Sequence, residues 1–382
     1  MHASENAEHQ PPSAAGAGVD PETASAPGID WDAITRRPPI AVDAGAVAAR
    51  VRGQTVLVTG AGGSLGAPLA RALAAAGPAR LVLYDQHESS LFRLREALSA
   101  AAPDVAQRAV LGDVRDRRRL HRLFAAERPD LVFHLAAYKH VPWGEEDPEA
   151  FAAANVLGAQ YVLEAARESG VSRLVYPSTD KAIDPPSLYG ATKRLVEAML
   201  RVSAAEGGPT TVLVRFVNVL GSQGSAPETF ARLIREGRPL PITDTRMRRY
   251  WITPHQARLL LLHSACLDPQ SAVGGPSLTV APDAGDEIAI VDIARRLWAY
   301  LSPNGGEAPL AVTAPRPGER LAEPLVAPYE RLERLPLPGL LAVRGVPAPD
   351  AAATAAAYHR VAGLLDGDAG PQAVRDALFA FG

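Results

Sequence analysis

Hydrophobic positions along the chain follow two alternating patterns. Short apolar runs are typical of buried strands, and they predict six strands at residues 55–59, 81–84, 109–111, 131–135, 174–176 and 211–216. Between them, Leu and Ala recur every three or four residues, which predicts helices, most clearly at residues 69–76, 91–101, 120–127 and 150–168. Regular strand–helix alternation predicts an α/β fold with a doubly wound parallel sheet of the Rossmann type.

The alternation ends after residue 220, where prolines and glycines begin to separate shorter segments. We therefore expect an NAD-binding Rossmann domain over residues 39–220 and a smaller substrate-binding lobe, interleaved with the core, over residues 221–350. Residues 351–382 are expected to form a C-terminal helical tail. Residues 1–38 contain much Ala, Pro, Gly and Ser and no long apolar run, which predicts a disordered N-terminal tail.

Composition excludes several classes of function. The 39 Lys and Arg residues against 42 Asp and Glu residues give a net charge of -3, which argues against nucleic-acid binding. The one cysteine, Cys266, excludes an internal disulfide, and no metal site is predicted. Neither a signal peptide nor an uncharged run of membrane-spanning length is present, so we expect a cytoplasmic protein with no membrane span.

A glycine-rich loop, TGAGGSLG, joins the first predicted strand to the first predicted helix. Glycines at this spacing permit a tight turn and let the backbone approach a pyrophosphate, whose charge meets the positive end of the helix. Glycine clusters also occur in ordinary turns, but the place between a strand and a helix favours a dinucleotide site. The predicted contacts of the loop with the cofactor are Gly60, Gly62, Gly63, Ser64, Leu65 and Gly66.

An acidic residue, Asp85, ends the second predicted strand and favours NAD over NADP. Its carboxylate can accept hydrogen bonds from a ribose diol and would repel a phosphate there. A helix cap is the alternative role of Asp85. Asp113, after the third strand, is expected beside the adenine by analogy with the fold, and a cap of the helix at residues 116–127 is its alternative. The other predicted cofactor contacts are Val114, Ala136 and Ala137.

Tyr189 and Lys193 stand four residues apart on the helix that is predicted to begin near Leu188, so they share one face. A tyrosine that acts as a base at neutral pH needs its pKa lowered by roughly three units, about 4 kcal/mol. Lys193 and an oxidised nicotinamide would supply the positive charge. Thr179, at the end of the fifth strand, could hold the substrate oxygen that Tyr189 deprotonates. A packed ring with a solvated amine is the alternative, but a phosphate loop after the first strand favours the catalytic interpretation.

Asp180 and Lys181 follow Thr179 directly and place an acid next to a base at the mouth of this site. Oxidation of an alcohol needs neither group. Elimination of water needs both, because one group removes a carbon-bound proton and the other protonates the departing hydroxyl. A surface ion pair that caps the following turn is the alternative.

From about residue 40 onward, the chain resembles the CapD-like polysaccharide biosynthesis family of extended short-chain dehydrogenases, which includes UDP-N-acetylglucosamine 4,6-dehydratases. The resemblance implies a nucleotide-sugar substrate, UDP-N-acetylglucosamine or a related hexose, and a 4-keto-6-deoxy product. It is carried by the segments VLVTGAGGSLG, LGDVRD, HLAAYKHVPWGEEDP, STDKAIDPPSLYGATK, VRFVNVLGSQGS, MRRYWIT and RPGERLAEPL.

The same resemblance implies a role for each reacting residue. Tyr189 takes the proton of the hydroxyl at carbon 4 while NAD accepts the hydride. Lys181 then removes the proton at carbon 5, Asp180 protonates the hydroxyl that leaves carbon 6, and the hydride returns to carbon 6. The residues implied to bind the substrate are Lys139, Asn218, Arg249 and Arg316. A salt-bridge partner, a strand-end cap and a surface charge are the alternative roles of Lys139, Asn218 and Arg316, respectively.

The chain also departs from the family pattern. It resembles a stand-alone form without the membrane spans of the larger members. Those members commonly carry methionine at the position of Tyr189, so the tyrosine of this chain is like that of the smaller soluble branch. Val217, Glu228 and Arg248 replace the usual glycine, proline and small polar residue. Glu228 and Arg248 lie in the expected lobe and Val217 lies just before it, so these departures bear on the sugar more than on the reaction.

Three alternatives and one further expectation remain at this stage. An epimerase would use Tyr189 and Lys193 but needs neither Asp180 nor Lys181, and a dehydratase that inverts carbon 5 has the same residues. An NAD-binding regulatory protein would be expected to have lost catalytic side chains. We also expect a homo-oligomer, a dimer or higher, which assembles through the helices around Ala159 and Leu195.

Overall fold

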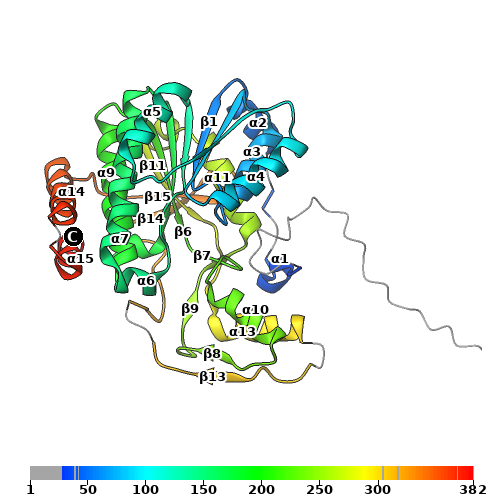
Figure 1. The fold of residues 1–382 in the computed structure, drawn as a ribbon. Helices are drawn as coiled ribbons and strands as arrows, with labels where there is room; N and C mark the ends of the chain where they lie inside the picture. The colour runs from blue at the N-terminus through cyan, green and yellow to red at the C-terminus, as the bar shows by residue number, and fades with distance from the viewer. Residues whose placement is uncertain are drawn as a thin grey trace, which may run out of the picture.

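A computed structural model describes residues 28–37, 40–41, 43–302, 305–315, 318–367 and 369–381. A central sheet with helices on both faces stands above a smaller lobe (Figure 1). The predicted α/β class with a doubly wound, mostly parallel sheet is confirmed.

The central sheet has nine strands in the order β14-β15-β11-β6-β5-β4-β1-β2-β3. The first six strands of the chain and β11 run parallel, whereas β15 is antiparallel to β11 and to β14. Strand order reverses between β1 and β4, and their carboxyl ends open a crevice there. The strands are β1 Thr55–Thr59, β2 Arg80–Asp85, β3 Ala106–Leu111, β4 Leu131–His134, β5 Arg173–Thr179, β6 Thr210–Phe216, β11 Ser277–Pro282, β14 Arg331–Arg334 and β15 Leu340–Arg344.

Helices cover both faces of the sheet, so β4 and β5 are buried at every position. This burial on both faces is why their sequences contain continuous apolar runs. One face carries α2 Ala44–Val51, α3 Gly66–Ala76, α4 Glu88–Ala101 and α11 Pro254–Cys266. The other face carries α5 Arg117–Glu127, α7 Pro148–Ala152, η1 Ala153–Leu157, α8 Gly158–Glu168 and α9 Leu188–Ala205.

Two of the predicted helices show how local sequence sets their form. The helix predicted at residues 150–168 contains a π-helical segment, η1, between α7 and α8. The helix predicted to begin near Leu188 does begin there, because the Ser187 hydroxyl accepts a hydrogen bond from the Gly190 amide, 3.3 Å away. This cap places Tyr189 in the first turn of α9, next to the end of β5.

The lobe is built around its own small core, which includes Phe230, Trp251 and Leu297. Two helices form much of it, α10 Ala226–Arg235 and α13 Ile290–Leu301. Its strands pair in three short sheets: β7 Asn218–Val219 with β10 Trp251–Ile252, β8 Leu240–Ile242 with β13 Leu310–Val312, and β9 Arg248–Arg249 with β12 Ile288–Ala289. The remaining short elements are α6 Val141–Glu146, η2 Asp180–Ala182 and α12 Pro269–Val273.

The predicted disordered tail extended to residue 38, and for part of this segment the prediction is wrong. Trp31–Thr35 forms helix α1, whose N-cap Asp30 accepts hydrogen bonds from the amides of Asp32 and Ala33. Trp31 and Ile34 join the core of the lobe, so tertiary packing holds a helix that the local composition does not predict. Residues 1–27 and 38 lie outside the described residues.

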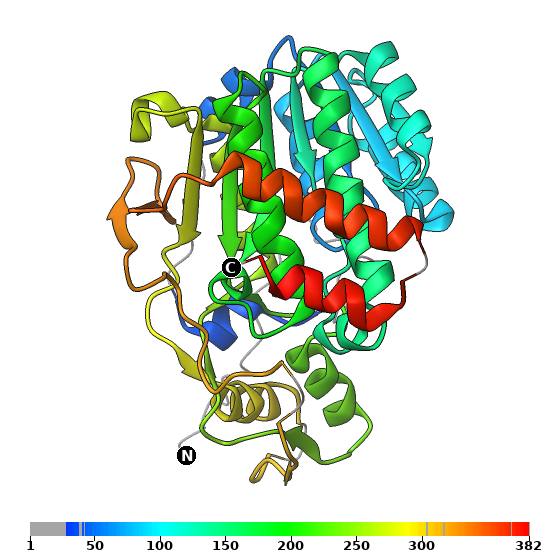
Figure 2. The same ribbon diagram turned by 90° about the vertical axis from the view of Figure 1, so that its left-hand side faces the viewer.

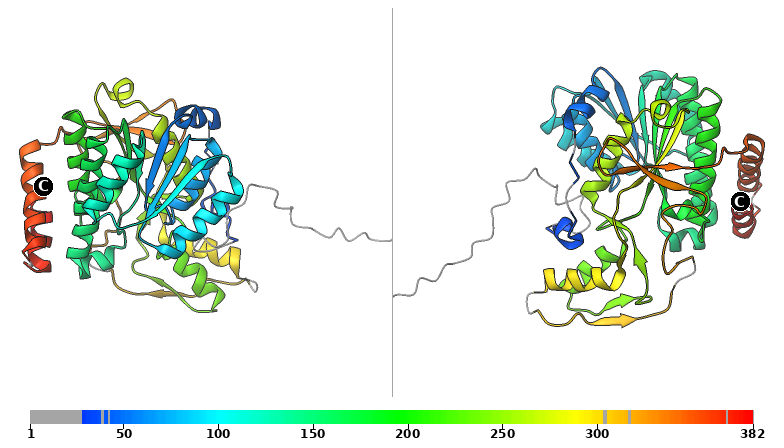
Figure 3. Two further views of the ribbon diagram at one scale, coloured as in Figure 1. Left: turned by 45° about the horizontal axis from the view of Figure 1, so that its top comes forward. Right: turned by 180° about the vertical axis from the view of Figure 1, so that it is seen from behind.

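Two C-terminal helices, α14 Ala351–Asp366 and α15 Pro371–Phe379, lie across the outer side of α9 (Figure 2). From two further directions they form one flank of the molecule (Figure 3). Val361 and Leu378 share a hydrophobic core with Leu195 of α9. The chain itself therefore contacts the helix that we expected to pair with a second copy. Among the described residues, no helix combines the length and hydropathy needed to cross a membrane.

Candidate active site

A pocket of about 470 Å³ opens at the carboxyl ends of β1, β4 and β5, and it reaches from the glycine loop to the first turn of α9. This volume lies within the usual range for small-molecule sites, about 300–1,000 Å³. Twelve of the thirteen predicted cofactor contacts line it, the exception being Gly62. The predicted residues that line the pocket are Gly60, Gly63, Ser64, Leu65, Gly66, Asp85, Asp113, Val114, Ala136, Ala137, Lys139, Thr179, Lys181, Tyr189, Lys193 and Asn218.

The glycine loop leaves no room for side chains at two of its positions. Gly60 has a φ of 68°, and a Cβ atom there would lie 2.7 Å from the amide nitrogen of Ala136. A Cβ atom on Gly66 would lie 2.0 Å from the carbonyl oxygen of Gly60. Leu65, the N-cap of α3, makes no side-chain cap, so the start of this helix is open to an anion. These features fit a pyrophosphate.

Asp85 is fixed at the end of β2 by two amides. Its oxygens accept hydrogen bonds from the amides of Gly62 and His87, each 2.8 Å away, and its side chain lines the pocket. Asp85 is not the N-cap of α4, because α4 begins at Glu88 and its N-cap is His87. The carboxylate therefore connects the loop with the end of β2, where a ribose diol would lie.

Asp113 also lines the pocket, and it forms a salt bridge with Arg115. The helix cap that was its alternative role belongs to Asp116, whose side chain accepts a hydrogen bond from the Arg119 amide at 2.9 Å. The backbone of Asp113 is held as well, because its carbonyl accepts a hydrogen bond of 2.7 Å from the Tyr84 hydroxyl.

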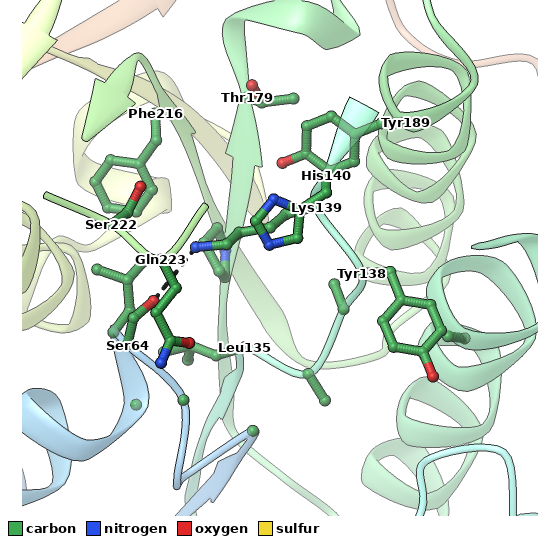
Figure 4. Close-up of a pocket in the computed structure, with 18 of the residues that line it drawn as sticks. Ser64, Leu135, Tyr138, Lys139, His140, Thr179, Tyr189, Phe216, Ser222 and Gln223 are labelled. Atoms are coloured by element: carbon green, nitrogen blue, oxygen red, sulfur yellow. Dashed lines mark hydrogen bonds between the residues drawn. The ribbon is translucent and has the colours of Figure 1, made fainter. Parts of the chain in front are cut away.

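Tyr189 and Lys193 both face the pocket from α9, and the Tyr189 hydroxyl points into it (Figure 4). The Lys193 amine donates a hydrogen bond to the Pro177 carbonyl at 2.9 Å and lies 4.3 Å from the centre of the Tyr176 ring. Burial lowers the pKa of Lys193 to about 7, against the opposing charge of Glu197. Burial raises the pKa of Tyr189, and the Asp180 carboxylate raises it further. Deprotonation of Tyr189 therefore needs added positive charge in the pocket.

Asp180 and Lys181 form a close pair in η2. The Lys181 amine donates to Oδ1 of Asp180 at 3.0 Å, and the Thr179 hydroxyl donates to the same oxygen at 2.9 Å. Asp180 is only 1% exposed and lies behind Lys181, which lines the pocket. Its Oδ2 atom is buried and has no hydrogen-bond partner within the described part of the chain. Asp180 and Lys181 therefore do not form a surface ion pair.

Lysine is rare in this chain and is concentrated in the pocket. Only three of the 39 Lys and Arg residues are lysines, namely Lys139, Lys181 and Lys193. All three line the pocket. An amine can lose its proton near neutral pH when it is buried, whereas a guanidinium cannot. All the lysine amines of the chain therefore lie at one site.

The predicted substrate residues have different surroundings. The Lys139 amine approaches the Ser64 hydroxyl at 3.5 Å (Figure 4), and burial lowers its pKa, opposed by the charge of Glu228. Nδ2 of Asn218 is buried without an acceptor among the described residues, so it can donate to a ligand. Arg249 does not line the pocket, because its guanidinium donates to backbone carbonyls. Arg316 lies outside the described residues.

Further residues reach the pocket that the sequence reasoning did not single out. Figure 4 shows His140, Ser222 and Gln223 among them. His140 occupies the space beside Gly224, where a Cβ atom would lie 2.3 Å from the imidazole. His140 directly follows Lys139, and Ser222 and Gln223 occupy the turn after β7, so their position at strand ends was an available signal. Glu323 does not line the pocket but lies 3.9 Å from the Lys181 amine, and nothing local in the sequence indicates this contact.

Comparison with known proteins found a matching family and several similar proteins. Residues 56–344 match the sequence profile of a family described as polysaccharide biosynthesis protein. The chain is 34% identical over 291 residues to the probable polysaccharide biosynthesis protein EpsC of Bacillus subtilis (strain 168), which covers 76% of this chain and 48% of EpsC. It is 40% identical over 206 residues to a UDP-N-acetylglucosamine 4,6-dehydratase (inverting) of Campylobacter jejuni, 52% of this chain and 60% of that protein. The chain thus spans about half the length of EpsC and three fifths of the dehydratase.

Solved structures share the fold. Pen from Bacillus thuringiensis superposes with a TM-score of 0.66 and 26% identity, over 77% of this chain and 88% of Pen. MoeE5, solved in complex with UDP-glucuronic acid and NAD, superposes with a TM-score of 0.58 and 25% identity, over 70% of this chain and 88% of MoeE5. The fold is that of the extended short-chain dehydrogenases.

Proposed function

The chain belongs to the polysaccharide biosynthesis protein family, and from this premise we propose that it is an NAD-dependent nucleotide-sugar 4,6-dehydratase. The observation that carries the proposal is the pair of a buried acid, Asp180, and a base, Lys181, which lines the same pocket as Tyr189. Tyr189 and Lys193 alone would serve an oxidation. The adjacent acid and base are what elimination of water adds to it.

The residues present fit a dinucleotide. Glycines without room for a Cβ atom surround the start of α3, and Asp85 is held by backbone amides where an adenosine ribose would lie. MoeE5, whose fold is similar, was solved with NAD. Bound NAD would accept a hydride from carbon 4 of the sugar and later return it to carbon 6. An anionic Asp85 disfavours the extra phosphate of NADP.

The side chains of this chain carry the proton transfers. Tyr189 takes the proton of the hydroxyl at carbon 4, and the Thr179 hydroxyl orients that oxygen. The ketone that forms acidifies the proton at carbon 5, which Lys181 removes. Asp180 gives its proton to the hydroxyl that leaves carbon 6 as water. When the hydride returns to carbon 6, the two protons held by Lys181 and Tyr189 supply the proton that carbon 5 regains and the proton that restores Asp180. Lys181 and Asp180 are 3.0 Å apart, so a proton can pass between them.

We propose UDP-N-acetylglucosamine or a related nucleotide hexose as the substrate. The Campylobacter jejuni relative is named for UDP-N-acetylglucosamine, and Asn218 offers an unused donor to a ligand in the pocket. Val217 lines the pocket, and Glu228 accepts a hydrogen bond from the Gly224 amide beside it. These departures from the family pattern act on the sugar subsite, so they affect which ring substituents fit.

An epimerase is the second candidate, because Tyr189 and Lys193 suffice for it. UDP-glucose 4-epimerase of Rickettsia akari is 33% identical over 205 residues, which cover 52% of this chain and 58% of that protein. An epimerase has no use for a buried acid beside Lys181, and this favours the dehydratase. Whether carbon 5 is inverted depends on the face from which it regains a proton, and the stereochemistry of the product decides it.

The proposal is tested by incubating the purified protein with a panel of UDP, dTDP, GDP and CDP sugars. Mass spectrometry should find one product that is lighter than its substrate by one water. Lys181→Ala should yield none. A product of unchanged mass that is an epimer of its substrate would establish the second candidate instead.

A further inference from the structure

Glu323 comes from the segment that follows the lobe, yet it lies against the acid–base pair. Its Oε1 atom is 3.9 Å from the Lys181 amine, and only 3% of the residue is exposed. Oδ1 of Asp180 lies 3.0 Å from the same amine. Lys181 is therefore in contact with two carboxylates, one adjacent in sequence and one 142 residues away.

The hydrogen bonding of Glu323 is unlike that of a structural carboxylate in this chain. Glu330, seven residues later, accepts hydrogen bonds from Arg215 on both oxygens and a third from the Ala327 amide. Oε2 of Glu323 is buried and has no partner among the residues described. A buried carboxylate oxygen without a hydrogen bond is destabilising. Structural support of the fold does not explain it.

Arg249 explains how Glu323 reaches this place. Its guanidinium donates to the carbonyls of Arg320 and Leu321 at 2.8 and 3.0 Å and so fixes the backbone just before Glu323. The Arg249 guanidinium lies 3.8 Å from Oε1 of Glu323, which is an ion-pair distance and too long for a hydrogen bond. Arg249 thus directs Glu323 towards Lys181 without saturating its carboxylate.

The charges that face Glu323 come from three elements. Lys181 and Asp180 belong to η2, Arg249 belongs to β9, and Arg320 lies in the segment of Glu323 itself. Burial raises the pKa of Glu323, and the charge of Asp180 raises it further. The positive charges of Lys181, Arg249 and Arg320 lower it. Arg320 is paired with Asp184. The other two cations, Lys181 and Arg249, and the two carboxylates, Asp180 and Glu323, compensate one another when all four are charged.

We propose that Glu323 is a positioning residue of the acid–base site, which holds the Lys181 amine and stabilises the ammonium that forms when Lys181 takes the proton from carbon 5. This inference rests on the proposed dehydration. In that step, the C5–H bond breaks, its proton goes to Lys181, and its electron pair forms the C5–C6 double bond. The C6–O bond breaks, and the leaving hydroxyl takes the proton of Asp180 to become water. Glu323 gains and loses no proton and acts through its charge.

The test compares Glu323→Gln with Glu333→Gln in the full chain. Both variants lose one carboxylate, but Glu333 is paired with Arg344 at the sheet edge, away from the pocket. Glu323→Gln should lower kcat for dehydration about 10- to 100-fold, because the new ammonium loses its counter-charge. The acid limb of its pH profile should move about one unit lower, since an ammonium without a nearby anion gives up its proton more easily. Glu323→Asp should keep the limb in place, and Glu333→Gln should match the unaltered protein.

A second readout does not depend on turnover. Acetic anhydride acetylates only unprotonated amines, and the chain has only three lysines, all in the pocket, so peptide mass spectrometry resolves each one. At pH 7, Glu323→Gln should raise the labelling rate of Lys181 about tenfold relative to Lys139 in the same digest. Glu333→Gln should leave this ratio unchanged.

The two readouts separate the inference from the proposed function. An unchanged Lys181 labelling ratio in Glu323→Gln overturns the inference, whatever the activity of the variant. If the unaltered protein converts no nucleotide sugar, the proposed function fails. In that case a tenfold rise in the Lys181 to Lys139 labelling ratio of Glu323→Gln still supports the contact of Glu323 with the Lys181 amine. A rise in the ratio together with the shifted acid limb supports both.

Discussion

The two ends of the pocket are built in different ways. At the glycine-loop end, consecutive residues 60–66 and Asp85 form a surface of backbone atoms packed too closely for an added Cβ atom at Gly60 or Gly66. At the acid–base end, Lys181 lines the pocket, and Asp180, Arg249 and Glu323 lie behind it. These four residues come from three distant segments, and their charges compensate one another. One end depends on the absence of side chains, and the other depends on charged side chains.

This difference predicts opposite sensitivities. An added methyl group should damage the glycine-loop end, because its neighbours there are backbone atoms that cannot move aside. An isosteric replacement that removes one charge should damage the acid–base end, because it leaves the other buried charges without their counter-charge. Binding and chemistry should therefore be separable by substitution.

The largest effect should come from the acid–base end. We expect Asp180→Asn and Lys181→Ala to lower kcat for dehydration by about 10³-fold or more, because each removes one partner of the proton transfers. NAD affinity, measured by fluorescence titration, should stay within about twofold of the unaltered protein, because neither residue contributes to the glycine loop. Normal dehydration by both variants would show that the acid and base lie elsewhere.

The next largest effect should come from the glycine-loop end. In Gly66→Ala, the new Cβ atom would lie 2.0 Å from the Gly60 carbonyl oxygen, so the loop must shift. We expect NAD affinity to fall about 10- to 100-fold, corresponding to the roughly 1–3 kcal/mol typical of overpacking. Gly363→Ala is a matched control, because a Cβ atom there meets nothing within 4 Å. Equal NAD affinities in the two variants would contradict the steric account of this end.

A smaller effect should follow from Asp85→Ser, which removes the carboxylate but keeps a hydroxyl. The Gly62 and His87 amides that now donate to Asp85 would then be available to a ligand phosphate. We expect the ratio of NADP to NAD affinity to rise about tenfold, since repulsion of the added phosphate is lost. An unchanged ratio would mean that another residue selects the cofactor.

A last effect, on stability rather than on affinity or turnover, concerns Lys193, between the two ends. Burial lowers its pKa to about 7 in the folded protein, from 10.5 for an ordinary lysine. Between these values the unfolded chain binds more protons, so the free energy of unfolding should rise with pH by up to about 1.4 kcal/mol per unit. This contribution should be absent in Lys193→Met. Urea unfolding at pH 7.5, 8.5 and 9.5 without added nucleotide measures the difference, and parallel pH slopes for the two proteins would contradict the buried, neutral amine.

The sequence predicted the glycine-loop end because that end is local. Strand β1, the loop and the start of α3 follow one another directly, so one short motif contains the whole arrangement. The six predicted strands of the Rossmann half correspond to β1–β6, and five of them are apolar runs that are buried over nearly all of the predicted residues. The exception is β3, which lies at the edge of the sheet and stays partly exposed.

The acid–base end could be predicted only in part. Asp180 and Lys181 are adjacent and were identified, but the sequence did not indicate that Asp180 is buried or that Glu323 lies 3.9 Å from the Lys181 amine. Arg249 was expected to bind substrate, whereas its guanidinium holds the backbone before Glu323. Helix α1 was missed for a related reason, because Trp31 and Ile34 are held by contacts with the lobe rather than by their neighbours in sequence.

One labelling experiment tests the dehydratase proposal most directly. The nucleotide sugar that the panel identifies as substrate is prepared with deuterium at carbon 4, and the product is analysed by mass spectrometry and NMR. The proposed function predicts that the product has lost one water and carries the deuterium on carbon 6. Deuterium that remains on carbon 4, or a product that keeps the mass of its substrate, would contradict it.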